Sequence, residues 1–447
     1  MNYQQTVTYL FNSTPVFEKI GAGAYKEGLS TTKALDEHLG HPHRHFKTIH
    51  VAGTNGKGSV SHTLAAILQS AGLKVGLFTS PHLVDFRERI RINGRCVSQR
   101  FVIDFVSQHR SFFEPLHPSF FELTTAMAFD YFARQHVDIA IIEVGLGGRL
   151  DCTNIITPIL SVITNISFDH TQFLGDTLSK IAGEKAGIIK QGVPVVIGES
   201  TDETRPVFEQ KAKEMNAPII FAEDDPVVTD SEYLPGGGRV YHLTPSITDD
   251  PQNPCHMSTL RGELGGDYQE KNTNTVLKAI NQLTSLLPGI TTQAVEHAFA
   301  HVCEMTGLTG RWQQTGSHPT IVCDTGHNVG GWQYLSKQLK SQPCHRLKMV
   351  FGMVDDKDID TVMDMLPTDA DYYFTKANNK RAISEQEVLA KGLAHGLKGT
   401  AYPTVSAAVD AALAASTPED FIFIGGSSYI VADYLEKKRH SSSPSAD

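Results

Sequence analysis

Apolar runs rich in β-branched residues alternate with helix-like patterns through the first half of the chain. Such a run between polar or glycine-containing turns predicts a buried strand, whereas apolar positions three or four residues apart predict an amphipathic helix. Strands are therefore predicted at 47–52, 74–79, 137–144, 159–166 and 193–198. Helices are predicted between them, at 59–71, 98–111, 122–135 and 177–190. Regular alternation of the two elements predicts a mostly parallel sheet with helices on both faces.

This pattern changes after residue 224. Residues 224–258 are rich in Pro, Gly and Asp, which predicts hairpins and a surface loop. Helical periodicity returns at 269–287 and 292–302, and the Gly-rich segment TGLTGRW at 306–312 predicts a linker.

A second α/β pattern follows the linker, and the polar end of the chain, EKKRHSSSPSAD, is expected to fray. Its strands are predicted near 320–324, 347–352, 371–375 and 421–425. We therefore expect an α/β protein of two domains. Residues 1–303 should form a domain built on a mostly parallel, P-loop-type sheet, and residues 308–447 a smaller, Rossmann-like α/β domain.

Composition agrees with a soluble, globular protein of more than one domain. A chain of 447 residues is too long for one ordinary core, and 40% hydrophobic with 20% charged residues is typical of globular proteins. The net charge of -10 argues against nucleic acid or an anionic membrane as the main partner. The six cysteines lack CxxC spacing, and the first residues lack a signal-peptide pattern. We expect a cytoplasmic monomer that binds small molecules.

The strongest local motif is TIHVAGTNGKGSV at 48–60, where an apolar strand enters a Gly-rich turn before a helix predicted to start at Ser59. Glycines at 53, 56 and 58 let the backbone approach an anion, the helix N-terminus attracts it, and Lys57 adds a charge. The spacing differs from the common G-x-x-x-x-G-K-[ST] pattern, because Gly58 separates Lys57 from Ser59. The alternative is a tight strand–helix turn with Lys57 in solvent, but the motif favours phosphate binding.

Three further polar residues also follow predicted strands. They are Ser80, Glu143 and His170. Ligands of open parallel sheets bind outside the carboxyl ends of the strands, so these residues and the 53–59 loop are expected at one site. A carboxylate at the end of a buried strand is costly unless it is paired, hydrated or metal-bound. Taken singly, Glu143 also suits a helix cap or ion pair, and the other two suit ordinary turns.

Lys185 lies on an apolar helical stripe formed by Leu178, Ile181, Ile188 and Ile189. A buried ammonium is costly, so a lysine on the inward face requires an explanation. On its own, the pattern favours a lysine whose ammonium extends from the helix edge to solvent.

Several motifs together resemble the folate branch of the Mur ligase superfamily. They are GTNGKGS at 53–59, TSPHL at 79–83, EVGLGGRLDCTN at 143–154, SFDHTQFLG at 167–175, EKAGI at 184–188, GRW at 310–312 and DTGHN at 324–328. The resemblance runs from about residue 15 to about residue 430, with the motifs in the same order. It implies an ATP-dependent ligase that joins L-glutamate to dihydropteroate or to folates through an acyl phosphate.

The resemblance also implies metal and catalytic roles. Two Mg²⁺ ions would be bound, with Ser59, Ser80, Glu143 and His170 as ligands. Lys185 would be carbamylated to N6-carboxylysine. The catalytic residues would be Lys57, Lys185, His170 and His327. Imidazole ligation of Mg²⁺ is unusual, since this ion prefers oxygen ligands.

Substrate and nucleotide contacts follow from the same resemblance. The ATP contacts would be Gly53, Thr54, Asn55, Gly56, Lys57, Gly58, Ser59, Asn272, Arg311 and Asp324. The pterin pocket would comprise Ser119, Phe120, Phe121, Glu122, Leu150, Asp151 and Cys152, although core packing explains either phenylalanine equally well. Glutamate would contact His327 and Ser427. The family pattern has proline after the Asn of DTGHN, whereas Val329 follows here, which leaves the shape of that loop open.

Three other functions were weighed against this ligase. A P-loop kinase or motor NTPase predicts the standard loop spacing and no second α/β domain. A cell-wall Mur ligase predicts an extra N-terminal domain for its UDP-linked substrate, but here the nucleotide loop begins at residue 53. A pterin-binding protein without catalysis would not need a full set of phosphate and metal residues.

Overall fold

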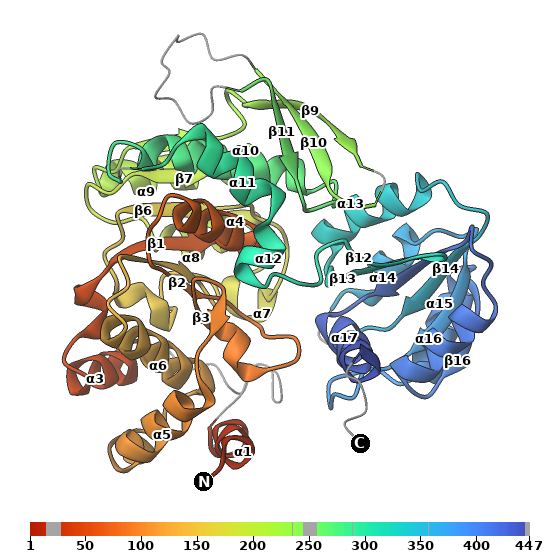
Figure 1. Ribbon diagram of the computed structural model, residues 1–447, viewed down its shortest axis with the longest axis horizontal. Coiled ribbons are helices and arrows are strands. Elements are labelled where there is room, and N and C mark those ends of the chain that lie inside the picture. Colours follow the sequence, from red (N-terminus) through yellow and green to blue (C-terminus); the bar gives the residue numbers. More distant parts are fainter. Residues whose placement is uncertain (15–27, 235, 245–256, 288, 356, 443–447) are drawn as a thin grey trace.

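The computed structural model describes residues 1–14, 28–234, 236–244, 257–287, 289–355 and 357–442. Two α/β bodies lie side by side, and a small antiparallel sheet extends from the first towards the second (Figure 1). The fold class predicted from the pattern of strands and helices is confirmed.

An eight-stranded sheet forms the centre of the first body, with strand order β4-β3-β2-β5-β1-β6-β7-β8. Strands β2, β5, β1, β6, β7 and β8 are parallel, and the short β3 and β4 complete one edge in antiparallel pairing. The strands are β1 (Lys47–Ala52), β2 (Val75–Phe78), β3 (Ile90–Ile92), β4 (Arg95–Cys96), β5 (Ile139–Glu143), β6 (Leu160–Ile163), β7 (Val195–Ile197) and β8 (Ile219–Phe221).

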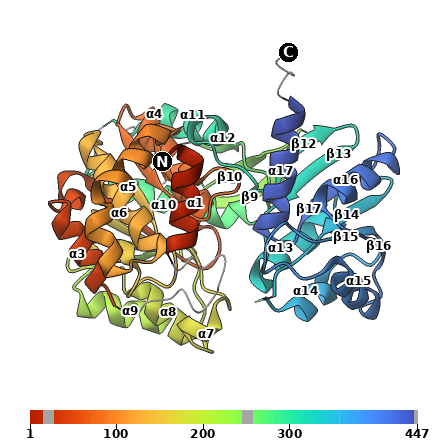
Figure 2. The same ribbon diagram turned by 90° about the horizontal axis from the view of Figure 1, so that it is seen from below.

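Helices cover both faces of this sheet, as Figures 1 and 2 show. One apolar core lies between the sheet and α4, α10 and α11, while others lie beneath α5 and α6 and beneath α8 and α9. The helices of this body are α1 (Tyr3–Ser13), α3 (Ser30–His38), α4 (Lys57–Ser70), α5 (Gln99–Phe113), α6 (Phe120–Arg134), α7 (Thr171–Leu174), α8 (Leu178–Ala186), α9 (Arg205–Glu214), α10 (Gln269–Leu283), α11 (Thr292–Ala300) and α12 (Val302–Thr306).

The Pro- and Gly-rich segment after residue 224 forms hairpin strands, as predicted. Strands β9 (Val228–Tyr233), β10 (Arg239–Leu243) and β11 (Thr259–Gly262) make an antiparallel sheet. The surface loop predicted in the same segment falls mainly on 245–256, outside the described residues.

The second body contains a six-stranded sheet of order β12-β13-β17-β14-β15-β16, parallel except at β12. Its strands are β12 (Gln313–Ser317), β13 (Thr320–Asp324), β14 (Leu347–Phe351), β15 (Asp371–Thr375), β16 (Lys398–Tyr402) and β17 (Phe421–Gly425). Its helices are α13 (Val329–Lys340), α14 (Ile359–Met365), α15 (Glu385–Ala394), α16 (Val405–Ala414) and α17 (Ser428–Ser442).

Some boundaries differ from those that the sequence predicted. Helix α4 begins at Lys57 rather than Ser59, because Gly56 already serves as its left-handed N-cap. Helix α8 ends at Ala186, so Ile188 and Ile189 are buried beyond the helix rather than on its stripe. Residues 436–442 extend α17 instead of fraying, and the rest of the tail predicted to fray, 443–447, lies outside the described residues. No helix in the described ranges is both long and apolar enough to cross a membrane.

The connector predicted at 306–312 joins the two bodies, and Gly310 lies where both come together. Its φ is +72°, and an added Cβ would lie 2.9 Å from Thr325 Cγ2 and 3.1 Å from Leu83 Cδ1. Leu83 belongs to the first body and Thr325 to the second. We propose 1–303 and 308–447 as the two domains.

Gly310→Ala should lower the free energy of unfolding by about 1–3 kcal/mol, because the left-handed backbone conformation is unfavourable for a residue with a Cβ. Gly183→Ala is the matched control: it lies within α8 with no atom within 4 Å of an added Cβ. That change should stabilise the protein by about 0.5–1 kcal/mol through helix propensity. Chemical denaturation of both variants measures the difference, and equal effects would contradict this account of the connector.

Candidate active site

Two adjoining cavities open at the carboxyl edge of the large sheet, beside the second body. Both are lined by the phosphate-type loop at Thr54 and Lys57, by Ser80, and by His327 from the second body. Every residue that the sequence predicted for the site lines one cavity or the other. We call them the loop cavity, which contains Ser59 and Arg311, and the aromatic cavity, which contains Phe120 and Phe121.

The loop between β1 and α4 depends on its glycines. Gly53 has φ +145°, and an added Cβ would lie 1.9 Å from Thr164 Oγ1. Gly56 has φ +85°, and there an added Cβ would lie 2.3 Å from Asn272 Oδ1. Side chains are therefore excluded from both positions, which brings the backbone close to its neighbours at the N-terminus of α4, a site that favours anions.

Lys57 is held inside the loop rather than in solvent. Its Nζ donates to the carbonyl oxygens of Gly53 and Thr54, each at 3.0 Å. Burial lowers the pKa of Lys57, although the nearby carboxylates of Glu143 and Asp169 act in the opposite direction.

Lys185 is buried, with 4% of its surface exposed, so its side chain does not extend to solvent. Its Nζ donates to the Gly53 carbonyl at 2.9 Å, the same oxygen that accepts from Lys57. Burial, with the positive charge of Lys57 adding to it, lowers the pKa of Lys185 to about 7. An amine in this environment is largely neutral just above neutral pH.

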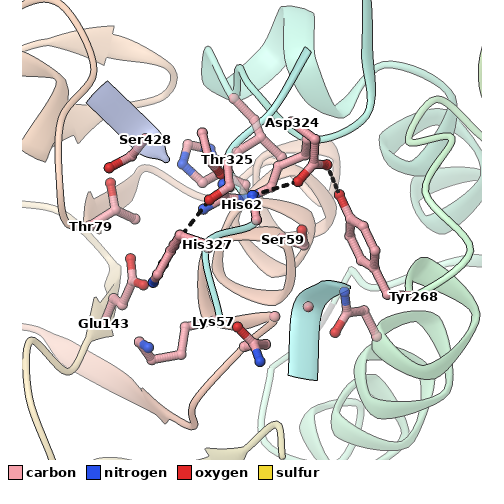
Figure 3. A pocket seen from close by; sticks show the side chains of 18 of the residues that line it. Lys57, Ser59, His62, Thr79, Glu143, Tyr268, Asp324, Thr325, His327 and Ser428 are labelled. Atoms are coloured by element: carbon pink, nitrogen blue, oxygen red, sulfur yellow. Dashed lines mark hydrogen bonds between the residues drawn. The ribbon is translucent and has the colours of Figure 1, made fainter. Parts of the chain in front are cut away.

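The carboxylate of Glu143 closes one side of the loop cavity, near Lys57 and His327 (Figure 3). It is 3% exposed, accepts the Ser80 N–H at 3.1 Å, and has a pKa raised by burial. In the described part of the chain no lysine or arginine forms a salt bridge with it, although the charges of Lys57, Arg311 and Arg89 act at longer range to lower its pKa. A buried carboxylate without such a partner fits a bound cation.

The other predicted metal ligands are divided between the cavities. Ser59 and Ser80 line the loop cavity with Glu143, whereas His170 lines the aromatic cavity. The Ser59 hydroxyl accepts from Gln269 Nε2 at 3.0 Å. Among the described residues, no group of three or more His, Cys, Asp and Glu side chains is arranged to hold a metal. Hydroxyl groups and the substrate's own oxygens would have to complete the coordination.

The aromatic cavity has a volume of about 310 Å³ and contains the whole predicted pterin set. Phe121 stacks on Phe78 with ring centroids 5.6 Å apart, and Phe120 stacks on Phe11 at 4.6 Å. Each phenylalanine therefore packs against another aromatic ring and also lines the cavity. Its position is compatible both with core packing and with contact to a bound ring.

The two acidic residues of the pterin set already accept local hydrogen bonds. Glu122 completes a capping box with Ser119 at the start of α6 and accepts from Thr32. Asp151 accepts the N–H groups of Gly145 and Leu146 through one oxygen, and the N–H and hydroxyl of Thr153 through the other. These contacts shape the cavity wall.

The second body completes the loop cavity. Arg311 lies against the loop, with its Nη2 3.4 Å from the position of a Cβ added at Gly58. Asp324 is buried and accepts the Tyr268 hydroxyl and the Trp312 N–H, each at 2.6 Å. Burial raises the pKa of Asp324. Figure 3 shows Tyr268 and Asp324 facing each other. No local pattern in the sequence pointed to Tyr268.

His327 faces acceptors through both ring nitrogens. Nδ1 lies 3.0 Å from the Thr325 carbonyl oxygen, and Nε2 lies 3.5 Å from the Asp169 carboxylate. Both of these partners are acceptors and cannot donate a hydrogen bond. Asp169 itself was not singled out in the sequence, although it lies within SFDH; nor was its partner Lys357, which lies in GMVDDKD.

Comparisons with known proteins agree with this geometry. Residues 51–231 match the "Mur ligase middle domain" and residues 310–428 match "Mur ligase, glutamate ligase domain". A dihydrofolate synthase/folylpolyglutamate synthase of Bacillus subtilis is 36% identical over 77% of this chain and 79% of its own length. The folylpolyglutamate synthase of Lacticaseibacillus casei is 32% identical over 97% of both chains.

A probable bifunctional folylpolyglutamate synthase/dihydropteroate synthase of Haloferax volcanii is 32% identical over 97% of this chain, which spans 50% of that relative. Among solved structures, E. coli FolC in complex with DHPP and ADP superposes with TM-score 0.82 at 28% identity, covering 99% of each chain. A bifunctional folylpolyglutamate synthase/dihydrofolate synthase with Mn, AMPPNP and L-glutamate bound gives 0.79 at 28% identity, covering 98% of each chain.

Proposed function

This chain belongs to the dihydrofolate synthase/folylpolyglutamate synthase family of the Mur ligases, and from that premise we propose that it uses ATP to join L-glutamate to dihydropteroate, to folates, or to both. The observation that supports this most strongly is the pair of adjoining cavities that share Thr54 and Lys57. One has the loop and cations for a triphosphate, and the other has the aromatic walls for a flat ring.

The reaction follows from placing an acid and a triphosphate on either side of the shared loop. A carboxylate oxygen of the pterin substrate attacks the γ-phosphorus of ATP, the bond to the β-phosphate oxygen breaks, and ADP leaves. The glutamate amine then attacks the acyl carbon, loses a proton, and phosphate leaves with the oxygen that bridged carbon and phosphorus. Holding the three reactants together supplies much of the rate enhancement.

Cations from both bodies would neutralise the anions. Lys57 and the N–H groups of residues 53–59 face the phosphates from one side, and Arg311 from the other. Asn272, which lines the loop cavity, and Asp324 would contact the nucleoside, the latter at the ribose or a metal-bound water. His327 lines both cavities, so it would contact phosphate or the incoming glutamate, with Ser427 as a further glutamate contact.

Divalent metal fits the site because Glu143 is buried and, among the described residues, forms no salt bridge with a lysine or arginine. Ser59, Ser80 and Glu143 would hold one Mg²⁺, and His170 with modified Lys185 a second. Mg²⁺ bound there would reduce the charge repulsion among the phosphate oxygens.

The experiment that tests the proposed function is ADP release measured with each substrate omitted in turn. Release should require both a pterin acid and L-glutamate. A kinase or simple NTPase would release ADP without glutamate, a cell-wall ligase would need a UDP-linked acid, and a binding protein would release none. Dihydropteroate compared with tetrahydrofolate as the acid distinguishes one ligase activity from two.

Lys57→Ala should reduce glutamate-dependent ADP release by about 100-fold or more, because a preorganised charge at the phosphates is lost. The matched control is Lys213→Ala, an exposed lysine on α9, which should leave turnover unchanged. Far-ultraviolet circular dichroism checks that both variants are folded. Near-normal turnover in folded Lys57→Ala would contradict phosphate binding by this loop.

We also propose that Lys185 works as its carbamate. The Gly53 carbonyl accepts from two lysines, and a carbamate on Lys185 would replace one of two neighbouring positive charges with a negative one beside the metal ligands. Carbamylation requires the neutral amine, and burial with the Lys57 charge favours that form by lowering the pKa to about 7.

Activity should therefore depend on CO₂ and on pH in a particular direction. Below about pH 7 the amine takes up a proton, so removing CO₂ there should lower turnover reversibly, and bicarbonate should restore it. Lys185→Arg keeps a positive charge but cannot form the carbamate, and it should lose turnover while still binding ATP. A ¹³C signal from labelled carbonate, present in wild type and absent in Lys185→Arg, identifies the modification; a plain ammonium in the fully active enzyme would refute it.

A further inference from the structure

One buried carboxylate of the first body is surrounded by side chains of the second. Asp169 lies in the loop between β6 and α7, and its side chain is 9% exposed. Lys357 Nζ lies 2.6 Å from its Oδ1, and Asn328 Nδ2 donates to its Oδ2 at 3.0 Å. His327 Nε2 lies 3.5 Å from the same Oδ2. These three partners belong to the second body. From the first body, the backbone N–H of His170 donates to Oδ1 at 2.9 Å, and its Nε2 lies 3.8 Å from the same oxygen.

These partners come from two adjacent loops of the second sheet. His327 and Asn328 follow β13, and Lys357 follows β14; both strands pair with β17. Their carboxyl ends therefore meet at one edge of that sheet. The Asp169 carboxylate contacts both loops at once, so it fixes that edge against the first body.

Asn328 extends the same network to the phosphate-type loop. Its amide and that of Asn55 form two reciprocal hydrogen bonds, at 3.0 and 3.1 Å. Its Oδ1 also accepts the Gly331 N–H as the N-cap of α13. One residue thus joins the loop of the first body, the carboxylate of Asp169 and the start of a helix in the second body.

We propose that Asp169 is a positioning residue for the ligation: it holds Lys357 and His327 of the second domain at the aromatic cavity, where the carboxylate substrate and the glutamate amine must meet. This inference rests on the proposed function for the identity of the reactants. The ion pair with Lys357 is buried on both sides, at 7% and 9% exposure. Removing one partner of a buried ion pair is costly in free energy, because the other charge remains buried without an opposite charge beside it.

A second ion pair between the bodies provides a natural comparison. Arg439 of α17 lies 3.3 Å from Glu88, but the arginine side chain is 57% exposed. An exposed pair contributes little, because water and salt screen it. Removing the exposed ion pair between the bodies is therefore not expected to change activity much, whereas removing the buried ion pair at Asp169 is.

Substitution of Asp169 is expected to impair the use of glutamate while leaving the affinity for nucleotide nearly unchanged. The nucleotide contacts proposed for Lys57 and Arg311 are made without Asp169, whereas Lys357 and His327 line the aromatic cavity directly. Asp169→Asn should lower kcat/KM for glutamate by at least about tenfold. The dissociation constant for ADP, measured by calorimetry on the folded protein, should stay within about threefold of wild type.

A double-mutant cycle tests whether the two residues act together. Asp169→Asn and Lys357→Met should each lower kcat/KM for glutamate, and the double variant should lie within about threefold of the worse single variant. Arg439→Ala is the control and should match wild type. If Asp169→Asn does not fold, Lys357→Met alone must still lower kcat/KM for glutamate while leaving the dissociation constant for ADP within about threefold of wild type.

Three results would overturn the proposal: normal glutamate kinetics in folded Asp169→Asn, losses that multiply in the double variant, or ADP affinity that falls as far as kcat/KM for glutamate. Calorimetric titration of the ADP-loaded protein with L-glutamate gives a readout independent of turnover, and Asp169→Asn should weaken glutamate binding at least about tenfold where Arg439→Ala does not. A wild-type protein that releases no ADP with glutamate and a pterin acid would instead refute the proposed function, leaving the glutamate-binding comparison valid.

Discussion

The carbonyl oxygen of Gly53 accepts hydrogen bonds from two lysines, and the candidate site is organised around that contact. Lys57 reaches it from the first turn of α4, and Lys185 from the last turn of α8. Two amines at one oxygen cannot both carry full charge at low cost in a buried setting. The loop therefore favours a negative charge nearby, either a bound phosphate or the carbamate of a modified lysine. Gly53 allows this because no side chain fits beside Thr164.

The second body completes the loop cavity, which the first body leaves open on one side. Arg311 and Asp324 close it there, and the connector glycine Gly310 lets the chain turn between the two bodies without a side chain in the way. Tyr268, at the start of α10, reaches across to Asp324. A cavity assembled from two bodies can exclude water when substrates bind and release products when the bodies separate.

The sequence predicted most of the fold and much of the site for identifiable reasons. Buried strands such as 47–52 and 421–425 were located to the residue, because burial on both faces leaves a nearly continuous apolar run. The edge strands β12 and β16 were missed, since their polar residues carry little periodicity. Residues with a local motif, such as Lys57, were identified from that motif.

Residues whose partners are distant in sequence were not identified. Asp169 contacts Lys357, which is 188 positions away, and Tyr268 contacts Asp324 through a bond that no local pattern encodes. The hydrogen bonds that occupy the Asp151 carboxylate are local but depend on the conformation of a turn, whereas the Ser119–Glu122 capping box follows a local S-x-x-E pattern. The contacts of Asp169 and Tyr268 need the three-dimensional arrangement of both bodies, and they decide which polar groups face the cavities.

In the proposed reaction, a carboxylate in the aromatic cavity receives the γ-phosphoryl group of ATP from the loop cavity. This transfer can be followed by labelling both carboxylate oxygens of the pterin substrate with ¹⁸O and analysing the released phosphate by mass spectrometry after a single round of ligation. We expect one ¹⁸O atom in each phosphate, because the oxygen that bridged carbon and phosphorus leaves with phosphorus. Phosphate free of ¹⁸O would show that the carboxylate was never phosphorylated and would rule out the acyl phosphate.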